Sequence, residues 1–340
     1  MLRHFHRGGG GSGSARPAVL AGLLVAGLIG CGPLLPDNRD DGIAADLQPQ
    51  FEVGDALFSS QPGVSGSLWM EIPRKDGSGK IGAYVSTNLT NRDAWVLMLD
   101  GAALVSWDGR VNQALFFLDT FGRTFQQAGF RTVSLVTSEC GGAYATRDLQ
   151  DVIDAVDWLQ TTGRSELGIE RLYVVGYSLG AMLSTHLNLH RKVDGVISIS
   201  GLSQPNQFED NYLLYRLVTD NFPTNEGVCQ LKSTYAAYGL PGDPRWSALD
   251  AAARVRDLQS PMLMVHGDRD AVLIVQNTRS FEKSYVSALK EGAALPAVEF
   301  MYLPGGDHFA PMIDPNVSIR VLEFIELQEV ARFSRRPLFP

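Results

Sequence analysis

The chain has 340 residues, of which 45% are hydrophobic and 19% are charged, and its net charge at pH 7 is −8. These values suit one large or two small globular domains with a full hydrophobic core, and they exclude an intrinsically disordered chain. Because the balance is acidic and no basic cluster occurs beyond Arg335 and Arg336, a nucleic-acid partner is not expected.

Residues 1–30 have the pattern of an export signal. Three arginines form a basic head, and the segment Ala18 to Gly30, "AVLAGLLVAGLIG", is an uncharged apolar core of thirteen residues. This core is too short to span a bilayer comfortably, but it has the length of a secretory signal. We therefore expect an exported protein.

The apolar core ends in "LIGC", Leu28 to Cys31, which resembles the bacterial lipobox. This resemblance implies that Cys31 is lipidated and is the first residue of the mature protein, with residues 31–66 as a tether to the membrane. In a host with two membranes, the same resemblance implies the outer membrane rather than the inner one, because Gly32 and not Asp follows the cysteine. The alternatives are an ordinary signal peptide with an incidental cysteine and an uncleaved anchor.

Two further cysteines, Cys140 and Cys229, would lie in an oxidising compartment if the chain is exported. A disulfide between them is then permitted. The alternative is two separate small apolar side chains, and the spacing does not decide between these.

From residue 67 to residue 334 the sequence predicts one α/β domain. An Asp-Gly hairpin signal joins the first two strand-like segments, and from Ala94 onward apolar runs of strand length alternate with amphipathic stretches of helical length. This alternation predicts a mostly parallel sheet with helices on both faces. We count eight strands, at 66–74, 81–88, 94–100, 130–137, 171–176, 194–200, 261–267 and 297–304. The last six residues, 335–340, are a tail.

One block interrupts the alternation, an aromatic-rich insertion at about 202–252 that follows the sixth predicted strand. Open α/β sheets bind ligands beyond the carboxyl ends of their strands, so this insertion is expected to shape a substrate pocket. The candidate wall residues are Phe208, Tyr212, Tyr215 and Trp246. These aromatic side chains could equally form the insertion's own core.

The segment "GYSLG" sets Ser178 between two glycines at the end of a predicted strand. A serine at a sharp turn between a strand and a helix presents its hydroxyl outward, and its neighbours must be small to avoid a clash. Ser178 is therefore a candidate nucleophile. The alternative is a serine that caps the start of the helix.

A serine nucleophile needs a histidine base, and the base needs a carboxylate. Downstream, Asp268 and Asp270 follow the predicted strand that ends in "MVHG", and His308 follows the last predicted strand. The order Ser, Asp, His places each residue just past the end of its own strand. Asp307 is expected to face solvent, because the carboxylate must reach the imidazole from another loop.

The motifs "GYSLGA", "HGDRDAV" and "GGDHF" resemble those of the α/β-hydrolases, most closely the dienelactone hydrolases and prolyl-oligopeptidase catalytic domains. The resemblance covers about Gly66 to Phe333. It implies a catalytic triad of Ser178, His308 and Asp270, with Asp270 preferred to Asp268. It also implies a structural role for His266.

Acyl transfer also needs two N–H donors for the oxyanion. The expected donors are the backbone amides of Leu179, directly after the serine, and of Ala102, in the loop after the strand at 94–100. Many relatives have His-Gly in that loop, whereas this chain has Asp100-Gly101. An acidic side chain would oppose an oxyanion, so Asp100 is expected to point away from it.

Neither a metal nor another cofactor is expected. His186 and His190 are four residues apart on one predicted helix, but no third ligand and no H-E-x-x-H glutamate accompanies them, so surface or core roles are favoured.

These observations predict a lipid-anchored, exported serine hydrolase that cleaves carboxylic esters of small or polymeric substrates. Two alternatives remain. One is a peptidase of the prolyl-oligopeptidase type, and the other is a non-catalytic surface lipoprotein that retains the fold. The sequence leaves the oligomeric state and the substrate open.

Overall fold

The computed structural model describes residues 58–59, 67–87, 92–101, 114–136, 147–204, 235–240 and 242–335. The chain divides into two compact units, Met1–Asp41 and Gly42–Pro340, and all described residues belong to the second. Among the described helices, none combines the length and apolar character needed to cross a membrane.

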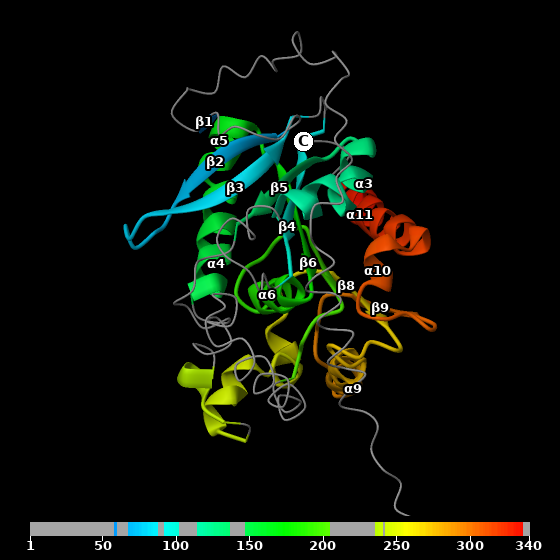
Figure 1. Ribbon diagram of the computed structural model, residues 1–340. Coiled ribbons are helices and arrows are strands. Elements are labelled where there is room, and N and C mark those ends of the chain that lie inside the picture. Colours follow the sequence, from blue (N-terminus) through cyan, green and yellow to red (C-terminus); the bar gives the residue numbers. More distant parts are fainter. Residues whose placement is uncertain are drawn as a thin grey trace, which may run out of the picture. The chain divides into compact units, whose positions relative to one another are not determined.

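The core of this unit is a nine-stranded sheet with the order β1-β2-β3-β5-β4-β6-β7-β8-β9 (Figure 1). The strands are β1 (Phe58–Ser59), β2 (Ser67–Pro73), β3 (Lys80–Ser86), β4 (Ala94–Leu99), β5 (Arg131–Leu135), β6 (Arg171–Tyr177), β7 (Gly195–Ile199), β8 (Met262–Gly267) and β9 (Val298–Leu303). The predicted eight-stranded, mostly parallel α/β sheet is therefore confirmed. The two-residue strand β1 extends it by one strand at the edge.

Six neighbouring strands are parallel, in the spatial order β5, β4, β6, β7, β8 and β9. The strands β1, β2 and β3 are antiparallel to their neighbours. The hairpin between β2 and β3 turns at the predicted Asp-Gly. The Asp76 carboxylate accepts a hydrogen bond from the Ser78 amide at 2.8 Å, and Gly77 has φ 73°. A residue with a Cβ would be strained at that φ, so the glycine permits the tight turn.

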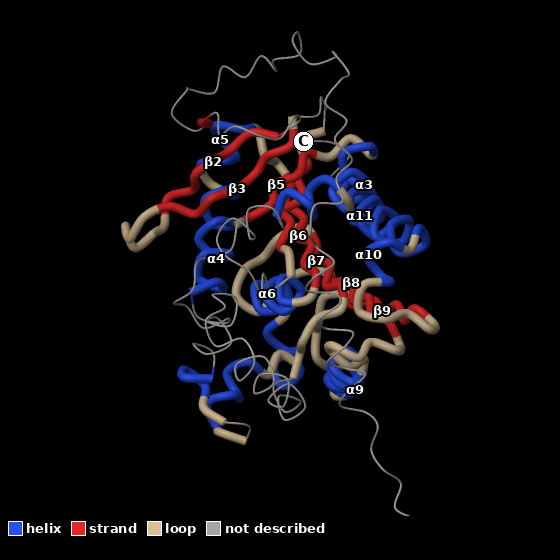
Figure 2. Tube along the Cα trace, viewed as in Figure 1, coloured by secondary structure: helices blue, strands red, loops and turns tan. Residues whose placement is uncertain are grey.

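The helices whose bounds lie within the described residues are α3 (Phe121–Gln127), α4 (Arg147–Gln160), α5 (Thr162–Leu167), α6 (Leu179–Asn188), α9 (Gln276–Lys290), α10 (Ala310–Ile313) and α11 (Pro315–Arg335), with 3₁₀ helices η2 (Pro244–Leu249) and η3 (Ala252–Asp257). The helices cover both faces of the sheet (Figures 1 and 2). The sheet itself separates two hydrophobic clusters, one on each face. Helices α4, α6 and α9 contribute to one cluster, and α3 and α11 contribute to the other.

The strand sequences explain this two-sided core. In β4, Trp95, Leu97 and Leu99 belong to one cluster, while Ala94, Val96 and Met98 belong to the other. Side chains alternate between the faces of a strand, so a strand covered on both faces must be apolar at every position. That is why the central strands read as continuous apolar runs. Because these strands are parallel, their carboxyl ends lie at one edge of the sheet.

Candidate active site

Ser178 lies at the turn between the carboxyl end of β6 and the start of α6. Its backbone has φ 54° and ψ −114°, and its amide donates a hydrogen bond to the carbonyl of Ile199 at 2.9 Å. A residue other than glycine at positive φ is strained, by about 1–3 kcal/mol. The sharp turn therefore depends on the surrounding structure.

The two glycines that flank Ser178 make this turn possible. A Cβ on Gly176 would lie less than 3.0 Å from the backbone of Gly180, and a Cβ on Gly180 would lie equally close to the carbonyl oxygens of Leu99 and Asp100. Helix α6 thus begins against the ends of β4 and β6, where only residues without side chains fit. This packing accounts for the G-x-S-x-G spacing.

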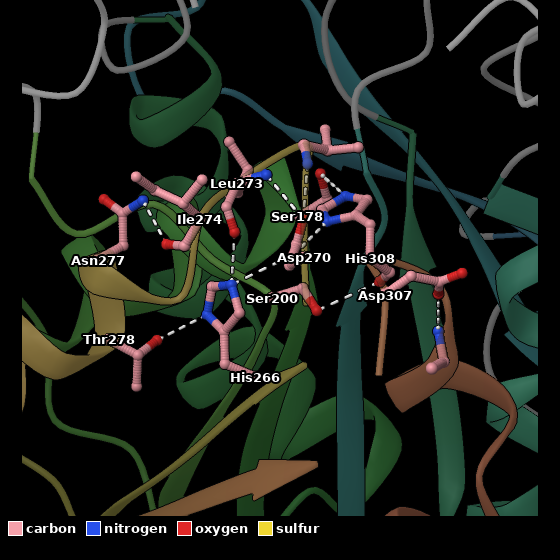
Figure 3. Close-up of polar contacts among 12 residues, drawn as sticks. Ser178, Ser200, His266, Asp270, Leu273, Ile274, Asn277, Thr278, Asp307 and His308 are labelled. Carbon is pink, nitrogen blue, oxygen red and sulfur yellow. Dashed lines mark hydrogen bonds and ion pairs between the residues drawn. The ribbon is translucent and has the colours of Figure 1, made fainter. Parts of the chain in front are cut away.

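The structure brings together Ser178, His308 and Asp270 from three separate loops (Figure 3). The Nε2 atom of His308 lies 3.0 Å from Ser178 Oγ, and its Nδ1 atom lies 2.7 Å from Asp270 Oδ2. Both distances are hydrogen-bonding distances. The loops follow β6, β8 and β9, so the parallel sheet aligns the three side chains at its carboxyl edge.

Asp270 is buried and receives hydrogen bonds at both of its oxygens. Its Oδ1 accepts from the amides of Val272 and Leu273, each at 2.8 Å. Burial would raise the pKa of Asp270, but hydrogen bonds to His266 and His308 outweigh it and lower the pKa to about 2. The carboxylate therefore stays ionised near neutral pH and can fix the orientation of His308.

The two neighbouring aspartates bind backbone amides instead. Asp268 is exposed, and its Oδ1 accepts from the amide of Gly305 at 2.7 Å. Asp307 is also exposed, and its Oδ1 accepts from the amides of Phe309 and Ala310 at 3.0 and 2.8 Å. Both carboxylates thus shape the loops that carry Asp270 and His308.

Three residues that the sequence reasoning did not single out surround His308. The hydroxyls of Tyr177 and Ser200 each lie 3.3 Å from the His308 carbonyl oxygen, to which they can donate. The Phe309 ring packs edge-on against the imidazole, with ring centroids 5.6 Å apart, and 50% of this residue is exposed. In the sequence, Tyr177 directly precedes Ser178 and Phe309 directly follows His308. This adjacency is the one sequence feature that indicated a place for them near the site.

The amide of Leu179 is the first N–H of α6. The first four N–H groups of a helix have no partner within the helix, so this amide is available to an anion. Asp100 follows β4 and is only 3% exposed. The second expected donor, Ala102, lies outside the described residues.

Most of the predicted pocket and cysteine residues also lie outside the described residues, namely Phe208, Tyr212, Tyr215, Cys31, Cys140 and Cys229. Trp246 is described, and it is only 3% exposed. Its ring centroid lies 5.5 Å from that of Tyr235 and 5.1 Å from that of Tyr238, within the larger hydrophobic cluster. Trp246 therefore packs in this cluster beside two other aromatic side chains of the insertion.

Within the described part of the chain, no group of three His, Cys, Asp or Glu side chains could hold a metal ion. His186 is buried in α6 and His190 is partly exposed one turn later. Burial and the charge of Arg254 lower the pKa of His186 to about 4, despite an opposing hydrogen bond that the imidazole donates to the Leu249 backbone carbonyl.

The arrangement of Ser178, His308 and Asp270 can activate a hydroxyl. The imidazole can take the serine proton, and the ionised carboxylate can stabilise the resulting imidazolium. This chemistry suits acyl transfer to the serine oxygen.

Comparison with known proteins gives the family. Residues 106–319, more than half of the chain, match the model of the Alpha/beta hydrolase family, and the chain belongs to this family. It is a hydrolase by family. No curated protein matches the sequence.

Solved structures with the same fold include esterases and peptidases at low identity. A truncated carbohydrate esterase from gut microbiota is 16% identical with a TM-score of 0.57, and the match covers 81% of this chain and 98% of that one. An esterase of Pyrococcus furiosus is 16% identical with a TM-score of 0.56, covering 79% and 97%. The acylaminoacyl peptidase of Pyrococcus horikoshii is 12% identical with a TM-score of 0.52, covering 78% of this chain but only 42% of the peptidase.

Proposed function

We propose that this hydrolase cleaves carboxylic esters through an acyl-enzyme on Ser178. The observation that carries the proposal is the continuous chain of contacts from Ser178 Oγ to His308 Nε2 at 3.0 Å and from His308 Nδ1 to Asp270 Oδ2 at 2.7 Å. A serine hydroxyl is a weak nucleophile unless a base is within hydrogen-bonding distance. A role confined to helix capping would not require that base, and the Ser178 side chain caps no amide of α6.

In the first half of the reaction, Ser178 Oγ bonds to the ester carbonyl carbon while its proton moves to His308 Nε2. The tetrahedral intermediate then collapses, the bond to the alcohol oxygen breaks, and His308 returns the proton to the departing alkoxide. In the second half, water attacks the acyl carbon and gives a proton to His308. The bond from the acyl carbon to Ser178 Oγ then breaks, His308 returns the proton to that oxygen, and the acid leaves. Asp270 holds His308 and stabilises its charge throughout.

The oxyanion of each intermediate needs fixed donors. We assign the amide of Leu179 as one donor and that of Ala102 as the other. The position of Leu179 at the start of α6 supports the first assignment, because an unpaired amide and the positive end of the helix dipole both favour an anion. The burial of Asp100 within the protein supports its exclusion from the substrate side.

We further propose that the enzyme acts outside the cytoplasm, anchored by lipid on Cys31. The basic head, the apolar core and the "LIGC" sequence support this proposal. Its test is metabolic labelling with a palmitate analogue, which should mark the full chain and leave the Cys31→Ala variant unmarked.

A peptidase is the second candidate, because the solved structures with this fold include acylaminoacyl and puromycin-hydrolysing peptidases. The two activities differ in the leaving group, which is an alcohol in one and an amine in the other. Purified full chain should hydrolyse p-nitrophenyl esters of acetate to octanoate faster than aminoacyl-anilides, and Ser178→Ala should remove both activities. Anilide cleavage without ester turnover would replace the esterase by the peptidase.

A further inference from the structure

A second histidine contacts the carboxylate that holds His308. His266, near the carboxyl end of β8, is 0% exposed. Its Nε2 lies 2.6 Å from the Leu273 carbonyl oxygen and 3.2 Å from Asp270 Oδ2, and its Nδ1 lies 2.7 Å from Thr278 Oγ1 (Figure 3). Asp270 thus lies between two imidazole rings.

These contacts define the protonation of the His266 ring. Nε2 faces a carbonyl oxygen and an ionised carboxylate oxygen, and neither carries a proton, so Nε2 must be the donor. In the neutral ring Nδ1 is then an acceptor, and the Thr278 hydroxyl donates to it. The Leu273 and Thr278 contacts together fix the plane of the ring.

The Asp270 carboxylate consequently has four donors. Two amides occupy Oδ1, from Val272 and Leu273, and two ring nitrogens share Oδ2, from His266 and His308. His266 Nε2 has a single proton, which it shares between the Leu273 carbonyl oxygen at 2.6 Å and Asp270 Oδ2 at 3.2 Å, so its contact with Oδ2 is the weaker of the two. A carboxylate held in this way keeps Oδ2 directed at His308.

We propose that His266 is a positioning residue for the reaction, which orients Asp270 and takes up part of the negative charge on Oδ2. This inference rests on the proposed function of Ser178, His308 and Asp270, and it goes beyond a role for His266 in packing alone. The Nε2–H of His266 competes with His308 for the same oxygen. Without it, the full charge of Oδ2 would act on His308, and the imidazolium would be more stable.

The proposal therefore predicts a change in pH dependence with a definite sign. Because His308 must be neutral to accept the serine proton, a more stable imidazolium moves the acid limb of the pH profile to higher pH. The titratable groups that act on Asp270 are His266 and His308.

Three other ionisable groups in the described part of the chain near this end of the sheet have partners of their own. Asp268 and Asp307 bind backbone amides, and Tyr302, which pairs with His266 across β8 and β9, donates to Glu282 at 2.6 Å and lies under the Arg279 guanidinium. None of the residues that make these hydrogen bonds is substituted in the variants below. We therefore do not expect them to cause a difference in pH profile between the variants.

The experiment measures the rate at which a fluorophosphonate probe labels the full chain between pH 4 and pH 9. It compares His266→Leu, which removes the donor, with His266→Gln, whose amide nitrogen can replace Nε2. Thr278→Val is the matched control, because it removes the other hydrogen bond of the same ring and leaves the Nε2 donor in place. Circular dichroism and the urea midpoint report folding for each variant.

The proposal predicts that His266→Leu moves the acid limb of the labelling profile to higher pH by about 0.5 to 1 pH unit. At a pH on the acid side of this limb, the labelling rate should then fall by about three- to tenfold. His266→Gln should restore most of the wild-type profile, and Thr278→Val should keep it while losing stability. If His266→Leu does not fold, His266→Asn replaces it, since its shorter amide reaches toward Thr278 but not Asp270.

An unchanged acid limb in folded His266→Leu or His266→Asn would overturn the proposal, and so would an equal shift in Thr278→Val. In both cases wild-type labelling that disappears in Ser178→Ala would leave the proposed function intact. A wild-type chain that is not labelled at all would instead overturn the proposed function and this inference with it.

Discussion

The start of α6 packs directly on the end of β4, so that a Cβ on Gly180 would lie less than 3.0 Å from the carbonyl oxygen of Leu99. This contact joins the helix that follows Ser178 to the strand that leads into the expected oxyanion loop. A backbone carbonyl cannot swing aside as a flexible side chain can. The position of the serine relative to β4 therefore depends on glycine at residue 180.

Gly180→Ala should destabilise the fold by about 2–3 kcal/mol and lower the hydrolysis rate of the folded fraction, because α6 must shift away from β4. Urea unfolding and fluorophosphonate labelling measure the two effects. Gly77→Ala is the control, since no atom lies within 4 Å of a Cβ there and only the strain of φ 73° is added. Equal effects of the two substitutions on labelling would contradict this account of the turn.

The choice between the two aspartates after β8 gives a sharp test. Asp270→Asn should lower kcat by about 10³- to 10⁴-fold, because an amide can present N–H to His308 and favour the wrong tautomer. Asp268→Asn should leave kcat within a few-fold of wild type, since an amide oxygen can still accept from Gly305. The kcat of ester hydrolysis by the two variants distinguishes the aspartates. A greater loss of kcat in Asp268→Asn would show that Asp268, and not Asp270, supports His308.

Acid stability should depend on His186. Its charged form is disfavoured in the folded protein, where its pKa is about 4, against 6.5 for an unperturbed histidine. Between these values the unfolded chain binds more protons at His186, so the contribution of neutral His186 to stability is full above about pH 6.5, falls as the pH drops to 4, and then levels off. The loss amounts to ~3 kcal/mol.

Urea midpoints at pH 7, 5 and 4 measure this loss, and His186→Leu should flatten the dependence on pH. The matched control is His190→Gln, one turn away and partly exposed; partial burial lowers the pKa of His190 as well, so this variant should flatten the slope, but less than His186→Leu does. A slope of wild-type size in folded His186→Leu would show that other groups cause the acid sensitivity.

The nearly buried ion pair between Glu329 on α11 and Arg171 at the start of β6 should affect stability without affecting activity. Glu329 on α11 lies 2.8 Å from the Arg171 guanidinium and accepts from the Tyr173 hydroxyl, and its side chain is nearly buried. Glu329→Ala leaves Arg171 with Asp93 as its remaining carboxylate partner and leaves the Tyr173 hydroxyl without this acceptor, so it should lower stability by about 1–2 kcal/mol. Thermal unfolding should show this loss, while the kcat of the folded enzyme stays at the wild-type value. A fall in kcat would link α11 to the site.

The sequence predicted the sheet well because each buried strand must be apolar on both faces. The runs at β4, β6 and β8 could hardly be solvent-exposed, and their order along the chain defined the parallel sheet. Strand β1 escaped prediction because its two residues, Phe58 and Ser59, carry no periodicity. A strand that short is defined by its partner β2, which no local pattern reveals.

At the site, local motifs indicated Ser178, Asp270 and His308, but not what supports them. The Ser200 hydroxyl reaches the His308 carbonyl across 108 positions of sequence, and Ser200 itself has φ 52°. Neither the contact nor the strained backbone follows from residue type. His266 and Asp270 are only four positions apart in the sequence. Their contact nevertheless depends on the turn after β8, whose geometry does not follow from the residue types.

The measurement that tests the central claim most directly is fluorophosphonate labelling of the purified full chain beside Ser178→Ala and His308→Ala. The wild type should be labelled at Ser178, identified by mass spectrometry of the modified peptide, and both variants should lose labelling while remaining folded. Labelling that persists in folded Ser178→Ala, or a folded wild type that resists the probe, would contradict the proposal that His308 activates Ser178.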